Sequence, residues 1–229
     1  MALVNVIPDL GGSFEYLIRA GPRGRVGAAR GHGSATGSTG AAFAWLSVEG
    51  GEGQVVAGTI TADVGGRADV FDGSGWSVFI GPKTPFAVRG HLRYTIMARS
   101  WTTRIAPRIV EPSEVRETAG PDGSVIRTSC AGGPLACGES VHGPGGWASW
   151  PAHSRGRESM FLYRLSQRGS FAIEVLRTKE GGRHSEVVAD GQVRRVRRGP
   201  HAVVAAPGLA MVTVWALAER DEIAPQTNP

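Results

Sequence analysis

Apolar and polar residues alternate in short runs along most of the chain, and apolar residues rarely recur at helical spacing. The runs are rich in β-branched and aromatic residues and are bounded by Gly, Pro, Asp and Asn. Among them are FAWLSVEG, GQVVAGTITADV, WSVFIG, YTIMARSW, SMFLYRL, SFAIEVLRT, SEVVADGQVRRV and AMVTVWALA. Many short strands about 8 to 12 residues apart are typical of a β-sandwich or β-barrel, so the sequence predicts an all-β protein.

The two halves of the chain repeat a loose pattern of strands, a Gly-rich turn, a Gly-Pro step and a further strand, as in IGPKTPFAVRG and RRGPHAVVAAPG. In the second half, Asp190 and Gly191 separate two strand-like runs, and both are expected to adopt positive φ in a tight hairpin. Residues 111–145 are rich in Pro, Gly, Ser and charge, which indicates a crossing linker. The sequence therefore predicts two similar units, residues 1–110 and 146–229.

The net charge is +5, from 25 basic and 20 acidic residues, and only Lys83 and Lys179 among the basic residues are lysines. The densest basic run, RRVRR at residues 194–198, contains no aromatic residue and lies in an alternating strand pattern. Nucleic-acid-binding surfaces usually combine a basic face with aromatic side chains. We therefore expect no nucleic-acid partner and instead a small anionic substrate.

Membrane and secretion signals are not expected in this sequence. No apolar run is long enough to cross a membrane. The first residues, MALVNVIPDLGG, lack the basic segment of a signal peptide, so we expect a cytoplasmic protein with no membrane partner. Cys130 and Cys137 are too few for a disulfide framework and too widely spaced for a CxxC pair, which predicts two free thiols on a loop.

The C-terminal half contains a series of short motifs in a characteristic order. They are Gly146-Trp147-Ala148-Ser149, Pro151, Tyr163-Arg164, Ser170-Phe171, Asp190-Gly191, Gly199-Pro200-His201-Ala202 and Ala205-Ala206-Pro207-Gly208. In these motifs the chain resembles the 5-deoxyglucuronate isomerase family of inositol catabolism. That family is related to the 4-deoxy-hexulosonate-uronate ketol-isomerases of pectin breakdown. The first half resembles the same family more weakly, best in GGRADVFDGSGWSVFIGPKTPFAV.

The resemblance implies a bicupin, in which two cupin-type β-barrels are fused in one chain. It places the active site in the barrel of residues 146–229. The barrel of residues 1–110 has no His-x-His pair and is expected to be structural or an oligomer surface. The resemblance also implies a homo-oligomer that isomerises a sugar acid through an enediolate. One divalent metal ion, such as Mn, Fe, Ni or Zn, would support this reaction.

The metal site of the family uses imidazoles and a carboxylate that point into the barrel from separate strands. By resemblance, His153 and His201 match the first and the last histidine ligand. The second histidine position holds Arg155, and the carboxylate position holds Ser159. The ligand set is therefore incomplete, and the sequence leaves open whether a metal is bound.

Glu158 and Glu174 are the candidates for the missing carboxylate and for a catalytic acid or base. Glu158 is next to Ser159, where a shift of one residue turns a side chain to the opposite face of a strand, but a shorter loop could still bring it in. Glu174 stands in an otherwise apolar strand and faces either the barrel interior or solvent. Tyr163 is a further catalytic candidate, with a purely structural core position as the alternative.

Three functional hypotheses follow from these residues. The first is a divergent isomerase that uses His153, His201 and a carboxylate. The second is a repurposed cupin of a biosynthetic pathway, in which Arg155 and Glu174 support proton transfer, dehydration or cyclisation without a metal. In that case Arg155 would bind a carboxylate or an enolate, whereas a solvated loop arginine is the simpler alternative. The third is a non-catalytic barrel that binds a small molecule.

Overall fold

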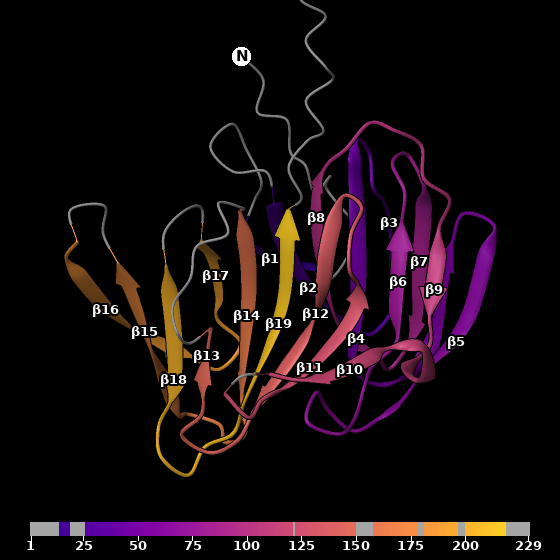
Figure 1. Ribbon diagram of the computed structural model, residues 1–229. Coiled ribbons are helices and arrows are strands. Elements are labelled where there is room, and N and C mark those ends of the chain that lie inside the picture. Colours follow the sequence, from indigo (N-terminus) through magenta and orange to yellow (C-terminus); the bar gives the residue numbers. More distant parts are fainter. Residues whose placement is uncertain are drawn as a thin grey trace, which may run out of the picture.

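The computed structural model describes residues 14–18, 26–120, 122–149, 158–177, 181–196 and 200–218 (Figure 1). Within these residues the regular structure consists of strands, apart from one 3₁₀ turn, η1 (Pro112–Glu114). The all-β prediction is therefore confirmed. Among the same residues, no helix is long and apolar enough to span a membrane.

The described residues up to 110 form one sheet of nine strands. The strands are β1 (Phe14–Ile18), β2 (Val26–His32), β3 (Ala35–Ser38), β4 (Ala42–Ala57), β5 (Ile60–Arg67), β6 (Ser77–Ile80), β7 (Pro85–Gly90), β8 (Arg93–Ser100) and β9 (Arg108–Val110). The main path runs β1-β2-β8-β4-β6-β9, and β5 and β7 pair with the long strand β4. The sheet encloses an apolar cluster that includes Leu46, Val55, Val88 and Ile96.

The remaining described strands form two further sheets, which we call the C-terminal sheets. The first has the order β10-β11-β12-β19-β14-β17 and the second has the order β13-β18-β15-β16. Their bounds are β10 (Arg116–Ala119), β11 (Val125–Cys130), β12 (Leu135–His142), β13 (Trp147–Ala148), β14 (Ser159–Leu165), β15 (Phe171–Arg177), β16 (Arg183–Ala189), β17 (Val193–Val196), β18 (His201–Ala205) and β19 (Met211–Ala218).

Strand β14 separates two apolar layers because its side chains alternate in direction. Met160 and Leu162 belong to a cluster that also contains Trp45 and Met97 of the N-terminal sheet, so this face of β14 packs between the two halves. Phe161 and Tyr163 belong to a different cluster, formed between the two C-terminal sheets. We call this second cluster, with the polar side chains that reach it, the C-terminal core.

The segment expected to be a crossing linker, residues 111–145, contributes three strands to the six-stranded C-terminal sheet, namely β10, β11 and β12. The linker prediction is therefore corrected for this segment: β12 pairs with β19 along its whole length and buries Leu135 and Cys137. Cys130 and Cys137 are free thiols, as expected, but they lie opposite each other on β11 and β12 rather than on a loop.

The Asp190–Gly191 turn connects β16 of one C-terminal sheet to β17 of the other. Only Gly191 adopts positive φ, at 76°, so the expectation of positive φ at Asp190 was wrong. Asp190 acts through its side chain instead, because its Oδ1 accepts a hydrogen bond of 2.9 Å from the Leu165 backbone N–H. The turn is fixed to β14 a second time, since the Gly191 N–H donates to the Tyr163 carbonyl at 2.8 Å.

Candidate functional site

The candidate site lies in the C-terminal core, where charged side chains enter an otherwise apolar space. Ala172 of β15, Val188 of β16 and Val203 of β18 pack there against Phe161 and other side chains of the facing sheet. Buried polar groups at such positions are costly unless they are paired or functional. The charged residues of this core are therefore candidates for a functional role.

Glu174 projects into this core from the middle of β15. It is 1% exposed, whereas its neighbour Ile173 on the opposite face is 39% exposed. Its cross-strand partners are Glu186 on β16 and Val203 on β18. The structure thereby decides between the two orientations that the sequence left open, and Glu174 faces the interior.

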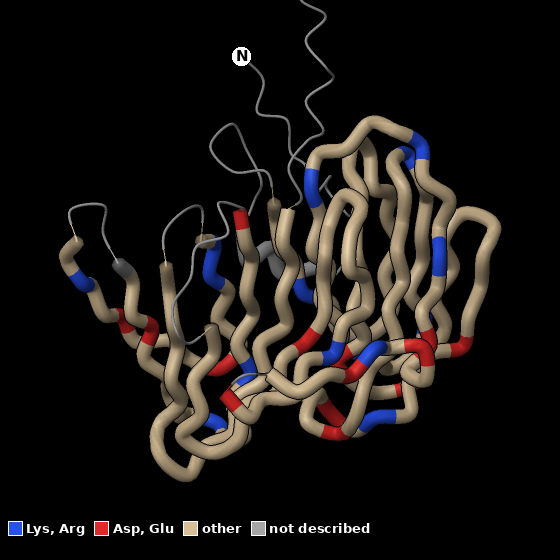
Figure 2. Tube along the Cα trace, viewed as in Figure 1, with Lys and Arg blue, Asp and Glu red and all other residues tan. Residues whose placement is uncertain are grey.

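Arg194 of β17 reaches Glu174 from the opposite sheet. Its Nε lies 3.4 Å from Glu174 Oε2, and its Nη2 forms an ion pair with Glu186 Oε2. The second oxygen of Glu174, Oε1, has no hydrogen-bond partner among the described residues. Glu174 and Glu186 are paired across β15 and β16, and Figure 2 shows acidic positions in red on both of these strands. The arginine thus bridges a buried and a half-exposed carboxylate.

The protonation of Glu174 follows from these contacts. Burial raises the pKa of Glu174 above its ordinary value, and the charge of Glu186 raises it further. The guanidinium of Arg194 acts in the opposite direction. A buried carboxyl group with a raised pKa and one unpartnered oxygen is suited to accept and return a proton.

Tyr163 lies on the same face of β14 as Phe161, and the two rings stack with centroids 6.3 Å apart. Its side chain is fully buried, and its hydroxyl has no hydrogen-bond partner among the described residues. Burial raises the pKa of Tyr163 well above its ordinary range, and the nearby charge of Glu174 adds to this effect. Tyr163 therefore stays neutral and offers a hydroxyl group beside Glu174.

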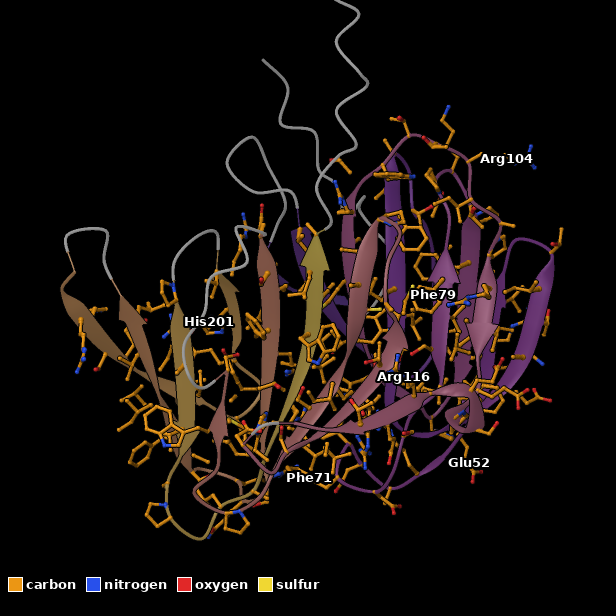
Figure 3. All side chains as sticks on the ribbon, viewed as in Figure 1. Glu52, Phe71, Phe79, Arg104, Arg116 and His201 are labelled. Carbon is orange, nitrogen blue, oxygen red and sulfur yellow. The ribbon has the colours of Figure 1, made fainter. Side chains whose placement is uncertain are left out.

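His201 begins β18, where Figure 3 labels it, and it is 6% exposed. Its ring packs on Phe161 with centroids 4.6 Å apart. On β18, His201 precedes Val203 by two residues, and Val203 is the cross-strand partner of Glu174. Since side chains two residues apart share a face of a strand, His201 and Glu174 both face the C-terminal core.

Glu158 does not lie in the C-terminal core, and this corrects its selection from the sequence as a site residue. Its Oε1 accepts a hydrogen bond of 3.3 Å from the backbone N–H of Val26 on β2 and lies 3.8 Å from Arg195 Nε. Ser159, the next residue, shares the face of Phe161 and Tyr163. The one-residue offset therefore directs Glu158 toward the N-terminal sheet and away from the C-terminal core.

His153 and Arg155 lie outside the described residues. Within the described part of the chain, no three His, Cys, Asp or Glu side chains gather as a metal-binding group would require. The two inward candidates, His201 and Glu174, are also differently engaged, because a ring contact holds one and Arg194 holds the other. The described residues thus do not fit a complete metal centre.

Two residues of the site, Arg194 and Glu186, were not selected from the sequence. A signal for Arg194 was present, because the pattern Val-Arg-Arg-Val on a strand sends one of its two arginines to each face. Arg194 pairs across strands with Phe161 and so shares the inward face of β14. Which of the two arginines faces inward depends on the register with β14, which the sequence does not show.

Comparisons with known proteins identify the family of the chain. The model of the KduI/IolB family matches residues 28–228. No curated protein matches the chain.

Three solved structures show the fold. An IolB-like protein from Salmonella typhimurium LT2 is 18% identical, with a TM-score of 0.81 over 96% of this chain and 94% of that protein. A glyoxylate-induced protein from Pseudomonas aeruginosa, itself assigned provisionally, is 13% identical, with a TM-score of 0.66 over 94% and 82% of the two chains. Bacillus subtilis oxalate decarboxylase, a protein with Mn(II) centres, is 11% identical, with a TM-score of 0.62 over 87% and 70%. At these identities the likeness concerns the fold, which is of the cupin type, as the sequence predicted.

Proposed function

The chain belongs to the KduI/IolB family, and we propose on that basis that it is a sugar-acid isomerase that interconverts an aldose and a ketose form of a small anionic substrate. The family supports an isomerase-type activity on sugar acids. The substrate class proposed here is that of 5-deoxyglucuronate, because the motifs of the C-terminal half resemble those of its isomerases.

The observation that carries the proposal is the position of Glu174. It is a buried carboxyl group inside the C-terminal core, it has an oxygen without a hydrogen-bond partner among the described residues, and its pKa is raised by burial. A general base works best when its pKa is near the working pH. A surface carboxylate would be a weaker base than Glu174.

In the proposed reaction the Glu174 carboxylate removes the proton from the carbon beside the substrate carbonyl. The electron pair of that C–H bond forms the double bond of an enediolate, and the carbonyl oxygen takes the negative charge. Glu174 then returns the proton to the neighbouring carbon, while a hydroxyl proton moves between the two oxygens. Among the described residues, Arg194 is the cation nearest to Glu174. Its positive charge favours the negative charge that develops on the enediolate.

The direct test is proton exchange. The full chain is incubated with 5-deoxyglucuronate in D₂O, and NMR follows both the ketose product and deuterium at the carbon beside the carbonyl. We expect both, and we expect the neutral analogue 5-deoxyglucose to react more slowly because it lacks the carboxylate. Binding of the sugar acid without exchange or product would contradict the proposal and favour a non-catalytic barrel.

The resemblance to this family also implies one divalent metal ion. Bound at His153 and His201, such an ion would polarise the substrate carbonyl. By the resemblance, Arg155 stands at the position of a ligand histidine, and Arg194 provides a cation 3.4 Å from Glu174. We therefore assign proton transfer to Glu174 without a step at a metal.

Chelation tests this assignment. Extended dialysis against EDTA is expected to leave the exchange rate unchanged, with metal content followed by elemental analysis. A matched His153→Ala/His201→Ala variant shows whether any metal present depends on these two histidines. Activity that disappears on chelation and returns with Mn²⁺ or Zn²⁺ would contradict the assignment and would restore the metal-dependent isomerase hypothesis.

A further inference from the structure

Arg194 reaches Glu174 because the chain changes sheets between β16 and β17. β16 is the neighbour of β15 in the four-stranded sheet, whereas β17 pairs with β14 in the six-stranded sheet. The turn at Asp190–Gly191 makes this crossing, and it is held by the Leu165 N–H at Asp190 Oδ1 and by the Tyr163 carbonyl at the Gly191 N–H. Arg194 therefore spans the core from one sheet to the other.

A second connection holds the same turn from outside the core. Arg164, on the face of β14 that packs against the N-terminal sheet, lies with its Nε 3.3 Å from Asp190 Oδ1. Its Nη1 donates to Glu49 Oε2 of β4 at 2.9 Å. The turn that precedes Arg194 is thus fixed to both halves of the molecule. The position of the Arg194 guanidinium therefore depends on contacts with both halves.

The opposing carboxylates explain why an arginine is needed at this place. Glu174 and Glu186 are directly opposite on neighbouring strands, where like charges repel. Arg194 divides its guanidinium between them, and its Nη2 also donates to the Val187 carbonyl at 3.4 Å. The side chain of Glu186 is 36% exposed and that of Glu174 is 2% exposed, so the bridge leads from the core to the surface.

Glu186 is suited to pair with Arg194 because its carboxylate stays charged. A hydrogen bond from His184, whose Nε2 lies 3.0 Å from Glu186 Oε1, lowers the pKa of Glu186, and Arg194 lowers it further. Glu186 therefore remains charged near neutral pH. The other groups that face Glu174 are Tyr163 on β14 and His201 on β18.

We propose that Arg194 and Glu186 are positioning residues of the reaction: Glu186 anchors the guanidinium at the rim of the C-terminal core, and Arg194 in turn holds the carboxylate of Glu174 in its working orientation. The inference rests on the proposed function, in which Glu174 transfers the proton. It assigns to Arg194 and Glu186 a joint role in setting the charge of Glu174.

The proposal predicts opposite shifts of the Glu174 pKa in two single variants. Glu186→Gln removes the charge that raises the pKa of Glu174 and frees Arg194 to pair with Glu174 alone, so Glu174 should titrate at lower pH. Arg194→Gln removes the charge that lowers the pKa of Glu174, so Glu174 should titrate at higher pH. Arg194→Lys keeps the charge without the fork that spans two carboxylates and should fall between wild type and Arg194→Gln.

The experiment is an NMR titration of the full chain with ¹³C-labelled glutamate side chains, in which the Glu174 signal is assigned by its loss in Glu174→Gln. Thermal melting confirms that each variant is folded, and Glu52→Gln, an exposed position on β4, serves as the control that should not move the Glu174 midpoint. Opposite shifts in Glu186→Gln and Arg194→Gln support the proposal. Shifts in the same direction, or no shift, would overturn it.

Turnover separates this role from direct substrate binding. The acidic limb of the pH profile of kcat should move with the Glu174 midpoint, to lower pH in Glu186→Gln and to higher pH in Arg194→Gln, while KM for 5-deoxyglucuronate is unchanged. A raised KM with an unmoved midpoint would show that Arg194 binds the substrate carboxylate instead, which overturns the proposal. Because the titration needs no substrate, a wild-type chain without isomerase activity would contradict the proposed function alone.

Discussion

Replacing Glu174 with glutamine is expected to lower the rate of sugar-acid isomerisation by about 10²- to 10⁴-fold, the usual contribution of a positioned acid or base. Glutamine has nearly the same shape and keeps the position in the C-terminal core, but it cannot accept a proton from carbon. The substitution leaves Arg194 with Glu186 as its partner, so no buried charge loses its last counter-ion. KM should change less than kcat, because the lost interaction belongs to the chemical step.

The same variant should change how stability depends on pH. Burial raises the pKa of Glu174 in the folded protein above its ordinary value of 4.5, so the native state binds a proton more strongly than the unfolded chain does. This contribution to stability is complete below the ordinary value and is lost as pH rises through the raised pKa. Glutamine removes the loss, so Glu174→Gln should be at least as stable as wild type at neutral pH.

Thermal melting at several pH values, together with the exchange assay in D₂O, measures both effects. Glu52→Gln removes an exposed carboxylate of the N-terminal sheet and should alter neither the rate nor the pH dependence of stability. Full activity in Glu174→Gln would reject Glu174 as the acid–base residue. A variant that is both inactive and strongly destabilised would point to a structural role for this carboxylate.

The second large effect concerns Arg67, whose substitution by methionine should lower the free energy of unfolding by about 3 to 5 kcal/mol. Arg67 ends β5 of the N-terminal sheet, and its guanidinium donates to both oxygens of Glu139 on β12, at 2.9 and 2.6 Å. The two side chains are 4% and 5% exposed. Methionine keeps much of the apolar stem but leaves the buried carboxylate without its closest partner.

The expected loss comes mainly from the charge that stays behind. Arg127 lies 3.8 Å from Glu139 Oε2 and is shared with Glu117, so it compensates only in part. Arg67 also donates to the carbonyls of Val48 and Gly73, and these acceptors lose a donor as well. A buried ion pair that is broken on one side costs more than a pair that is removed as a whole.

Urea unfolding of Arg67→Met, Glu139→Leu and the double variant measures the coupling between the two residues. The double variant should be more stable than the sum of the single effects predicts, because it leaves no unpaired charge. Arg89→Met, at an exposed position of the same sheet, should change stability little. A loss below about 1 kcal/mol in Arg67→Met would show that this pair contributes no more than a surface ion pair.

Glu174 and Glu158 show how much the local sequence pattern could predict about side-chain orientation. Alternation on the strand of Glu174 restricted that side chain to two orientations, and the one-residue offset of Glu158 from Ser159 already argued against Glu158. The structure settles both cases, since Glu174 is buried and Glu158 contacts Val26 and Arg195. His153 and Arg155 remain predictions from the resemblance, because they lie outside the described residues.

The strands of residues 111–145 were missed for a physical reason. Glycine, proline and charge are abundant there, yet β12 pairs with β19. Met211, the first residue of β19, lies opposite His142 and is about seventy residues further along the chain. A strand with such weak local signals is stabilised by its partners and by the apolar layer between the two halves, to which Leu135 and Cys137 contribute. These partners are distant in sequence, so no local pattern indicates them.

The sequence by itself determined the all-β class, most of the strands, the glycine turn at Gly191 and the family resemblance, because these depend on alternation, turn chemistry and motifs within a few residues of one another. The tertiary structure decided which charges meet. Arg194 reaches Glu174 only because the Asp190–Gly191 turn carries the chain from one C-terminal sheet to the other, and Arg67 meets Glu139 only where the two halves pack together. Contacts of this kind depend on register and sheet packing over long sequence separations, and the proposed chemistry depends on them as well.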